Sequence, residues 1–342
     1  MKNSLKNNTL NIKNAGGLAL ILVPILLTYV IEIIAYFADF ALVFVLNNYL
    51  GLDIDYDNTE AFSGIAPINT NLMLFLYAML CMIIFGWWYM LINGSTFSEG
   101  NTDSGKNGIR SFFTKKLPLM ILFGYSFQLL IDGILKLLRK LFPSLLEEHD
   151  NTISSLTDKG SFFLIITVVI LTPVAEELIF RAVTLHFCRK YMSDMAAIIV
   201  SAVLFGLYHS NPVQMAYAFI AGMILGFLAV KTGIIAAPIL MHIIINASAY
   251  LVPSVLFDSP VTTVLTIIAS CAVIYLVYFI VHKNHQDTDN KKNEEKQSGK
   301  LKGDKKIEEK QPGKIKDNKK PEEKQPGKRS ENNTQKNKAP RN

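Results

Sequence analysis

The chain has 342 residues, of which 50% are hydrophobic and 18% charged, and its formal net charge is +6. Residues 282–342 hold 19 Lys+Arg and 11 Asp+Glu, a net of +8, which leaves the preceding part with a net of −2. This apolar, nearly neutral part excludes a soluble α/β enzyme and lacks the basic surface that nucleic-acid binding needs. Cys81, Cys188 and Cys271 are too few and scattered for a disulfide framework or a thiolate metal site. The composition indicates a membrane protein.

Eight apolar stretches are long enough, at about 20 residues per crossing, to be membrane-spanning helices. They are residues 17–46, 71–93, 117–141, 161–190, 193–209, 213–230, 234–251 and 261–281. The first stretch exceeds a straight crossing at about 1.5 Å per residue, so we expect it to tilt, kink or end in an interfacial turn. The predicted fold class is all-α: a polytopic membrane helical bundle with about eight transmembrane helices.

Basic residues gather in the N-terminal arm and in the even-numbered connections between these helices. They are Lys2, Lys6, Lys13, Lys106, Arg110, Lys115, Lys116, Arg189, Lys190 and Lys231. The first connection carries only acidic charge, from Asp53 to Glu60. Because basic connections stay in the cytoplasm, the pattern predicts a multi-pass protein of the cell membrane with both termini cytoplasmic. The third connection mixes both signs and supports this assignment least.

The C-terminal tail repeats with a period of 14 residues. The pattern Lys-Lys-x-Glu-Glu-Lys-Gln begins at Lys291, Lys305 and Lys319. A segment with almost no apolar residues cannot offset its ordering entropy, so the tail is predicted to be disordered. A solvated cytoplasmic extension is the favoured interpretation. Attraction of the basic residues to anionic lipid or to an acidic partner is the other.

Ten ionisable side chains fall inside the predicted spans, where each is expensive and is a functional hypothesis by default. They are Glu32, Asp39, Asp132, Lys136, Glu176, Glu177, Arg181, His186, His209 and His242. Asp132 and Lys136 can pair one helical turn apart. For this pair, and for Glu32 and Asp39, a structural or interfacial role is favoured. His186 suits a position at the level of the lipid headgroups.

The fourth predicted helix places Glu176 and Glu177 next to each other in an apolar run. Arg181 follows Glu177 by four residues on the same helical face, so the two are predicted to pair. Glu176 is turned about 100° away and has no such partner. A buried carboxyl group without a cation suits the work of a general acid or base. Pro173 can kink the helix just before this point. The competing interpretation is an ion pair that locks two helices together.

Two further polar positions lie in the helices that follow. His209 ends the fifth predicted helix, and His242 and Asn246 share one face of the seventh. An imidazole with a carboxamide suits stabilisation of an oxyanion, although polar packing between helices is the alternative. His209 falls at the outer end of its helix, whereas Glu176 and His242 fall near the middle of theirs. A shared site therefore requires the fifth helix to shift, tilt or break.

Three motifs in this order resemble those of the CPBP intramembrane proteases. They are Glu-Glu-x-x-x-Arg from Glu176, Phe-x-x-x-His from Phe205 and His-x-x-x-Asn from His242. The family, also called Abi, includes type II CAAX prenyl endopeptidases and bacteriocin-immunity relatives. The resemblance covers about residues 160–250.

The resemblance suggests a division into three parts. Residues 1–159 form N-terminal transmembrane helices, 160–281 a CPBP-like catalytic helical core, and 282–342 the disordered basic repeat tail. The resemblance also implies an intramembrane endopeptidase that hydrolyses a peptide bond of a membrane-associated peptide or protein. The implied catalytic residues are Glu176, His209, His242 and Asn246, with Glu177 and Arg181 in support. The first glutamate and the first histidine would activate water, and His242 and Asn246 would hold the oxyanion.

The resemblance implies no cofactor firmly. The family has also been described as metalloproteases, and Glu176, His209 and His242 could supply three zinc ligands with an open fourth position. The sequence contains no His-Glu-x-x-His, and Asn246 is a poor zinc ligand. A metal-free glutamate mechanism is therefore favoured, with a divalent metal such as zinc left open.

A non-enzymatic bacteriocin-immunity or scaffold protein of the same fold is the main alternative function. A proton-coupled transporter ranks last, because Glu and His chains also serve proton relays but no inverted repeat is visible. The expected partners are membrane lipid and a membrane-associated peptide or protein substrate, without nucleic acid. The lysine- and asparagine-rich sequence is of a bacterial type. A peptide pheromone, a bacteriocin or a membrane protein therefore fits better than a prenylated substrate.

Overall fold

The computed structural model describes residues 12–52, 70–93, 102–157 and 162–283. The chain divides into two units, Met1–His282 and Lys283–Asn342. The helices below belong to the first unit, except that the last of them ends at Lys283. The predicted disordered tail from residue 284 onward lies outside the described residues. So do most of the acidic first connection and part of the second.

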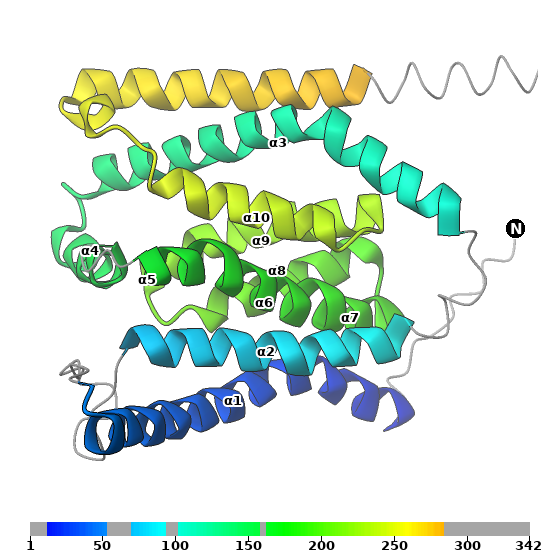
Figure 1. Ribbon diagram of the computed structural model, residues 1–342. Helices are drawn as coiled ribbons and strands as arrows, with labels where there is room; N and C mark the ends of the chain where they lie inside the picture. The colour runs from blue at the N-terminus through cyan, green and yellow to red at the C-terminus, as the bar shows by residue number, and fades with distance from the viewer. Residues whose placement is uncertain (1–11, 53–69, 94–101, 158–161, 284–342) are drawn as a thin grey trace, which may run out of the picture. The chain divides into compact units, whose positions relative to one another are not determined.

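Within the described ranges the protein is helical and has no strand. The long helices are α1 (Ile12–Leu50), α2 (Thr70–Asn93), α3 (Thr102–Leu138), α9 (Pro212–Thr232) and an unlabelled final helix, Pro260–Lys283. The shorter ones are α4 (Pro143–Thr157), α8 (Asp194–Tyr208), α10 (Ala236–Ala249) and the 3₁₀ turn η4 (Ser254–Phe257). A continuous helical stretch, Phe162–Tyr191, consists of α5 (Phe162–Ile166), η2 (Thr167–Leu171), α6 (Thr172–Glu177), η3 (Leu178–Thr184) and α7 (Leu185–Tyr191); Figure 1 labels α5, α6 and α7. The predicted polytopic helical bundle is confirmed.

Six of the described helices are long and apolar enough to cross a bilayer, and α8 and α10 are shorter apolar helices. With 15 and 14 residues, these two are about 22 and 21 Å long, less than a hydrocarbon core of about 30 Å. Ser193 caps the start of α8, which ends at Tyr208. Asn211 then caps the start of α9 by accepting from the Val213 and Gln214 amides. The fifth and seventh predicted spans are therefore real helices, but they are short ones.

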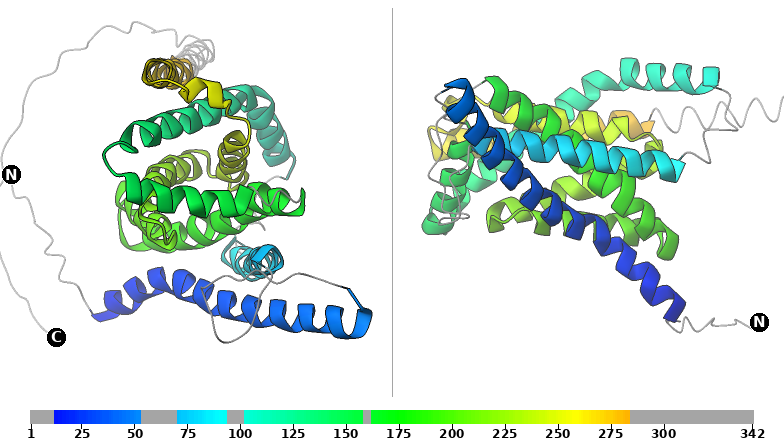
Figure 2. Two further views of the ribbon diagram at one scale, coloured as in Figure 1. Left: turned by 90° about the vertical axis from the view of Figure 1, so that its left-hand side faces the viewer. Right: turned by 60° about the horizontal axis from the view of Figure 1, so that its bottom comes forward.

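The first helix is longer than a bilayer requires. α1 has 39 residues and contains Pro24. It crosses α2 obliquely (Figure 2). Its outer face exposes large apolar side chains such as Leu26 and Phe37, as α2 does at Trp87. Such exposure suits contact with lipid tails rather than water.

The third connection contains a helix that the sequence analysis did not predict. α4 begins at Pro143, whose fixed φ suits the first turn of a helix. Its residue Asp150 pairs with Arg139 at the end of α3, and His149 Nε2 lies 3.4 Å from the Tyr217 hydroxyl of α9. The charges that made this connection ambiguous therefore dock α4 against its neighbours.

The middle of the Phe162–Tyr191 stretch lies at the centre of the bundle. In Figure 1 it runs between α2 and α10, and α6 and η3 contact α1, α2, α8 and α10. Phe85, Phe180 and Phe205 are among the largest fully buried side chains here. α8 and α9 approach closely at Gly222, which has no side chain. A Cβ added there would lie 3.1 Å from Ala202. This packing surrounds the two adjacent glutamates with protein rather than lipid.

Candidate active site

The two glutamates lie between two π-helical turns. α6 (Thr172–Glu177) follows η2 (Thr167–Leu171) and precedes η3 (Leu178–Thr184). The two π-helical segments each end in a hydrogen bond between residues five apart. The Thr172 amide donates to the Thr167 carbonyl after η2, and the Leu185 amide donates to the Phe180 carbonyl after η3. Such widened turns are frequent at functional sites. Pro173 has no N–H to close an α-helical turn, which is a physical reason for the first of them.

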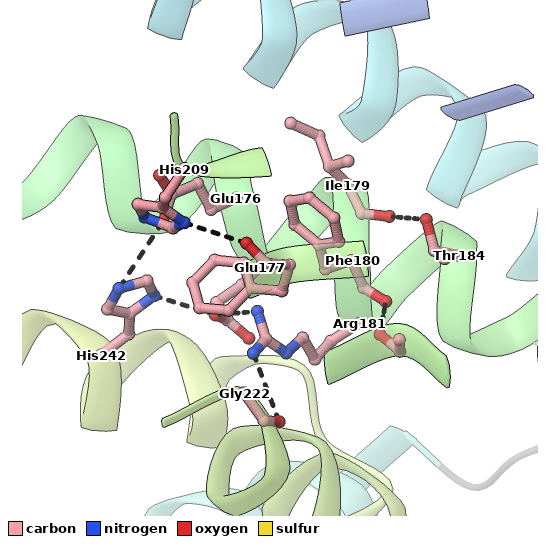
Figure 3. Close-up of polar contacts among 11 residues, drawn as sticks. Glu176, Glu177, Ile179, Phe180, Arg181, Thr184, His209, Gly222 and His242 are labelled. Atoms are coloured by element: carbon pink, nitrogen blue, oxygen red, sulfur yellow. Dashed lines mark hydrogen bonds and ion pairs between the residues drawn. The ribbon is translucent and has the colours of Figure 1, made fainter. Parts of the chain in front are cut away.

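Polar side chains satisfy the backbone of these widened turns. Asn246 Nδ2 of α10 donates to the Val168 carbonyl of η2 over 3.1 Å. Within η3, Thr184 Oγ1 donates to the Ile179 carbonyl over 2.8 Å, and Ser201 Oγ of α8 donates to the Phe180 carbonyl over 3.0 Å. Figure 3 shows the Thr184 bond. An unsatisfied buried carbonyl is costly, so these donors stabilise the irregular helix.

Glu177 and Arg181 form the ion pair that their spacing predicts. Arg181 Nη1 lies 2.8 Å from Glu177 Oε1, and both side chains are fully buried. The guanidinium also stacks over the Phe205 ring at 4.3 Å and donates through Nη2 to the Gly222 carbonyl at 3.4 Å. A buried ion pair needs such additional contacts to offset its desolvation. Glu177 is therefore held rigidly.

His242 connects the two glutamates. Its Nδ1 lies 2.9 Å from Glu177 Oε1, and its Nε2 lies 3.6 Å from Glu176 Oε2. Since a carboxylate only accepts hydrogen bonds, Nδ1 carries the proton and Nε2 faces Glu176 (Figure 3). Glu176, turned away from Arg181 as predicted, thus has a partner from α10 that the sequence analysis did not assign to it.

His209 lies at the end of the short helix α8, as its C-cap residue in extended conformation. Its Nδ1 donates to the Phe205 carbonyl over 2.9 Å, which leaves Nε2 as the basic nitrogen. Figure 3 shows the His209 ring on the same side of the cluster as Glu176, away from Arg181. Because α8 is too short to cross a hydrocarbon core of about 30 Å, a residue at its end need not lie at the membrane surface.

Residues 158–248 match the family model described as type II CAAX prenyl endopeptidase Rce1-like. All three motifs lie within the match. Residues 158–248 are a CPBP-family segment. No curated protein and no solved structure matches the chain. A membrane-protease fold is thereby supported for the segment from α5 to α10, while α1 to α4 and the last helix lie outside the match.

The donor atoms of the CPBP segment do not form a metal site as placed. Among the described residues, no group of three or more His, Cys, Asp or Glu side chains is arranged to hold a metal ion. Nδ1 of His242 donates to Glu177 and Nδ1 of His209 donates to the Phe205 carbonyl, which leaves Nε2 of each ring for other contacts. The three residues that the resemblance offers as zinc ligands, Glu176, His209 and His242, do not fit a three-ligand site in this arrangement. We derive no step through a metal.

Several contributors to the CPBP site escaped the sequence analysis. The two π-helical turns, Thr184, Ser201 and the Gly222 carbonyl have no motif of their own. Asn246 was predicted, but its amide contacts the backbone of η2 rather than either glutamate. The Pro173-containing turn was the one available indication of an irregular helix. The proline predicted where the helix is irregular, but not that the irregularity is a π-helical turn.

Proposed function

We propose that the protein is an intramembrane endopeptidase that hydrolyses a peptide bond of a membrane-associated peptide or protein by a Glu/His-activated water. The observation that carries this proposal is the buried array in which His242 joins Glu176 to the Glu177–Arg181 pair. A purely structural ion pair needs one glutamate. The second, whose Oε2 lies 3.6 Å from Nε2 of His242 and does not pair with Arg181, suits reaction chemistry.

The charges of this array balance if His242 carries both ring protons. Two carboxylates then face one guanidinium and one imidazolium, and the cluster is neutral. Glu176 and His242 are each 6% exposed, Arg181 4% and Glu177 0%. A neutral set of charges avoids much of the cost of burying any one of them. It also gives His242 a proton on Nε2 to donate.

The proposed reaction uses Glu176 as the general base, with Nε2 of His209 orienting the water. The water oxygen attacks the carbonyl carbon, and its proton passes to Glu176. The carbonyl oxygen becomes an oxyanion that accepts from His242 Nε2 and from the second N–H of the Asn246 amide. Glu176 then delivers its proton to the leaving amine, and the C–N bond breaks.

Glu177 and Arg181 position this machinery. Glu177 fixes the orientation of the His242 ring, and Arg181 neutralises Glu177. Asn246 keeps α10 in register with η2 through one N–H. The substrate reaches the site from the membrane, and the basic connections suggest that both termini of the enzyme lie in the cytoplasm.

The proposal is tested with the full-length protein reconstituted in liposomes. Solubilised membrane peptides from the host cell are added in ¹⁸O-labelled water, and new termini are read by mass spectrometry. Wild type should produce peptides that carry the label at a new C-terminus, and Glu176→Gln should not. Glu148→Gln, which removes an exposed carboxylate on α4, is the matched control and should behave as wild type. Labelled termini from Glu176→Gln at the wild-type rate would contradict the proposal.

A further inference from the structure

The carbonyl of Val168 lacks both backbone donors that a helix normally offers it. In an α-helical turn the donor is the amide four residues later, that of Thr172, but this amide donates to the Thr167 carbonyl instead. In a π-helical turn the donor is the amide five residues later, and that residue is Pro173, which has no N–H. The proline therefore leaves one carbonyl of η2 without a partner from its own helix backbone.

The nearest hydroxyl does not donate to this carbonyl. Threonine in a helix commonly donates to the carbonyl four residues earlier, as Thr167 Oγ1 does to Phe163 over 3.0 Å. Thr172 stands four residues after Val168, yet its Oγ1 is buried and has no hydrogen-bond partner within the described ranges. The donor comes from another helix, because Asn246 Nδ2 of α10 donates to the Val168 carbonyl over 3.1 Å.

This bond joins two helices just before the proposed catalytic glutamate. α10 packs against both η2 and α6, and Glu176 lies three residues after Pro173 within α6. α10 also carries His242, whose Nε2 lies 3.6 Å from Glu176 Oε2. A change in the contact between α10 and η2 therefore changes the position of Glu176 relative to His242.

We propose that Pro173 and Asn246 act as a pair: the proline removes a backbone donor from the helix, and the Asn246 amide replaces it from α10. Asn246 is thereby a positioning residue for Glu176. This inference deepens the proposed function and rests on it for its catalytic meaning. The pairing uses one N–H of the amide and leaves the other for the oxyanion.

The pairing is tested without a substrate, by thermal unfolding of the full-length protein in detergent. Asn246→Ala should lower Tm by roughly 2–6 °C, because the Val168 carbonyl is left unsatisfied. Adding Pro173→Ala to this variant restores a backbone N–H and should recover most of the loss. In the wild-type background the same substitution has no unsatisfied carbonyl to restore. The effect of the proline on the unfolded chain is common to both backgrounds and cancels in the comparison. Additive changes in Tm would overturn the proposal.

Ser248→Ala is the matched control on α10. Its Oγ donates to the Ile244 carbonyl of the same helix over 2.7 Å, so its effect should add to that of Pro173→Ala without coupling. If Asn246→Ala fails to accumulate in membranes, the amount of folded protein replaces Tm as the readout. Pro173→Ala should then restore accumulation, and a double variant that stays absent would contradict the pairing.

Infrared spectra of the reconstituted protein test the positioning role. The carboxyl and carboxylate bands of Glu176 are those that Glu176→Gln removes. Asn246→Ala should shift these bands, and Ser248→Ala should leave them in place. Unshifted bands in Asn246→Ala would refute the positioning of Glu176. Coupled changes in Tm and shifted bands without any peptide cleavage by wild type would keep the pairing and refute the proposed function alone.

Discussion

The two adjacent glutamates differ in what they contact, and this difference assigns their roles. Glu177 Oε1 faces both Arg181 and His242 at 2.8 and 2.9 Å, whereas Glu176 approaches only Nε2 of His242, at 3.6 Å. Glu177 is thus held through Oε1 by two close partners, whereas Glu176 has a single, longer contact with His242. The sequence distinguishes them only by the spacing to Arg181.

Replacing Glu177 or Glu176 by glutamine should therefore change the stability of the protein to different extents. Glu177→Gln leaves the Arg181 guanidinium buried without its counter-ion, and breaking a buried pair costs about 3–5 kcal/mol. Glu176→Gln should cost less, because the nearest charged partner of Glu176 lies 3.6 Å away. Thermal unfolding of the purified protein in detergent measures both. A Glu177→Gln protein as stable as Glu176→Gln would show that the Arg181 pair does not hold the core.

At the residue scale, the spacing rules succeeded within one helix and stopped between helices. The Glu177–Arg181 contact follows from helical periodicity alone. The contact of His242 with Glu177 does not, because it depends on how far α10 is rotated against α6. The π-helical turns change the register of every residue that follows them, which a regular 3.6-residue period cannot anticipate.

Among the elements, the close packing of α8 on α9 sets the position of His209. A Cβ on Gly206 would lie 2.9 Å from the Met215 carbonyl oxygen of α9, a backbone atom that cannot yield cheaply. We expect Gly206→Ala to push the helices apart and to cost about 1–3 kcal/mol. Activity should fall as well, because His209 follows three residues later.

Gly86→Ala is the matched control for this packing. Its Cβ would meet only a Leu178 methyl group at 3.9 Å, an ordinary contact. Alanine is also the better helix former, so this variant should be neutral or slightly stabilising. Thermal unfolding and cleavage assays should separate the two alanines. Equal behaviour would mean that α8 and α9 do not approach as closely as described.

Another element-scale prediction concerns the docking of α4. Burial lowers the pKa of His149 from its ordinary value of 6.5, and the carboxylate of Asp150 opposes this only in part. The folded protein therefore holds His149 neutral, while the unfolded chain binds a proton below about pH 6.5. The stability contributed by the docked helix is fully present above that pH and declines as the pH falls toward the lowered value.

The detachment of α4 from α9 can be measured as susceptibility of α4 to an added protease. Wild type should become more susceptible between about pH 7.5 and pH 5.5, since the protonated imidazole is less stable against α9. His149→Gln cannot titrate and should lose this pH dependence. Rates must be corrected for the pH dependence of the added protease with an unfolded peptide. A His149→Gln protein that opens with acid as wild type does would assign the effect to another group.

The elements themselves were largely predictable. Apolar runs located α2, α9, the Phe162–Tyr191 stretch and the apolar part of α3 (Lys116–Leu138) within a few residues, although α3 itself begins at Thr102, well before the predicted 117. α4 was missed because it is short and mostly polar, with Ser, Thr and Glu prominent, and it is stabilised by contacts with Arg139 and Tyr217. The bounds of α8 were predicted within one residue, whereas α10 (Ala236–Ala249) is shorter than the predicted 234–251, since hydropathy continues past its last hydrogen-bonded turn.

For the whole molecule, the proposed mechanism uses no metal, and this has a direct consequence. Treatment of the reconstituted protein with a zinc chelator, followed by its removal, should leave peptide cleavage within about twofold of the untreated rate. Metal analysis of the same sample should find less than one zinc per chain. Loss of cleavage that is restored by zinc and by no other addition would overturn the metal-free mechanism.

The central claim is that Glu176 is the base of an intramembrane protease. The most direct test compares the peptide termini in membrane fractions of cells that express wild type or Glu176→Gln at matched protein levels. The account predicts termini that appear only with wild type, each pointing to a substrate. Identical termini, with any immunity phenotype retained by the variant, would contradict it and leave the non-enzymatic scaffold.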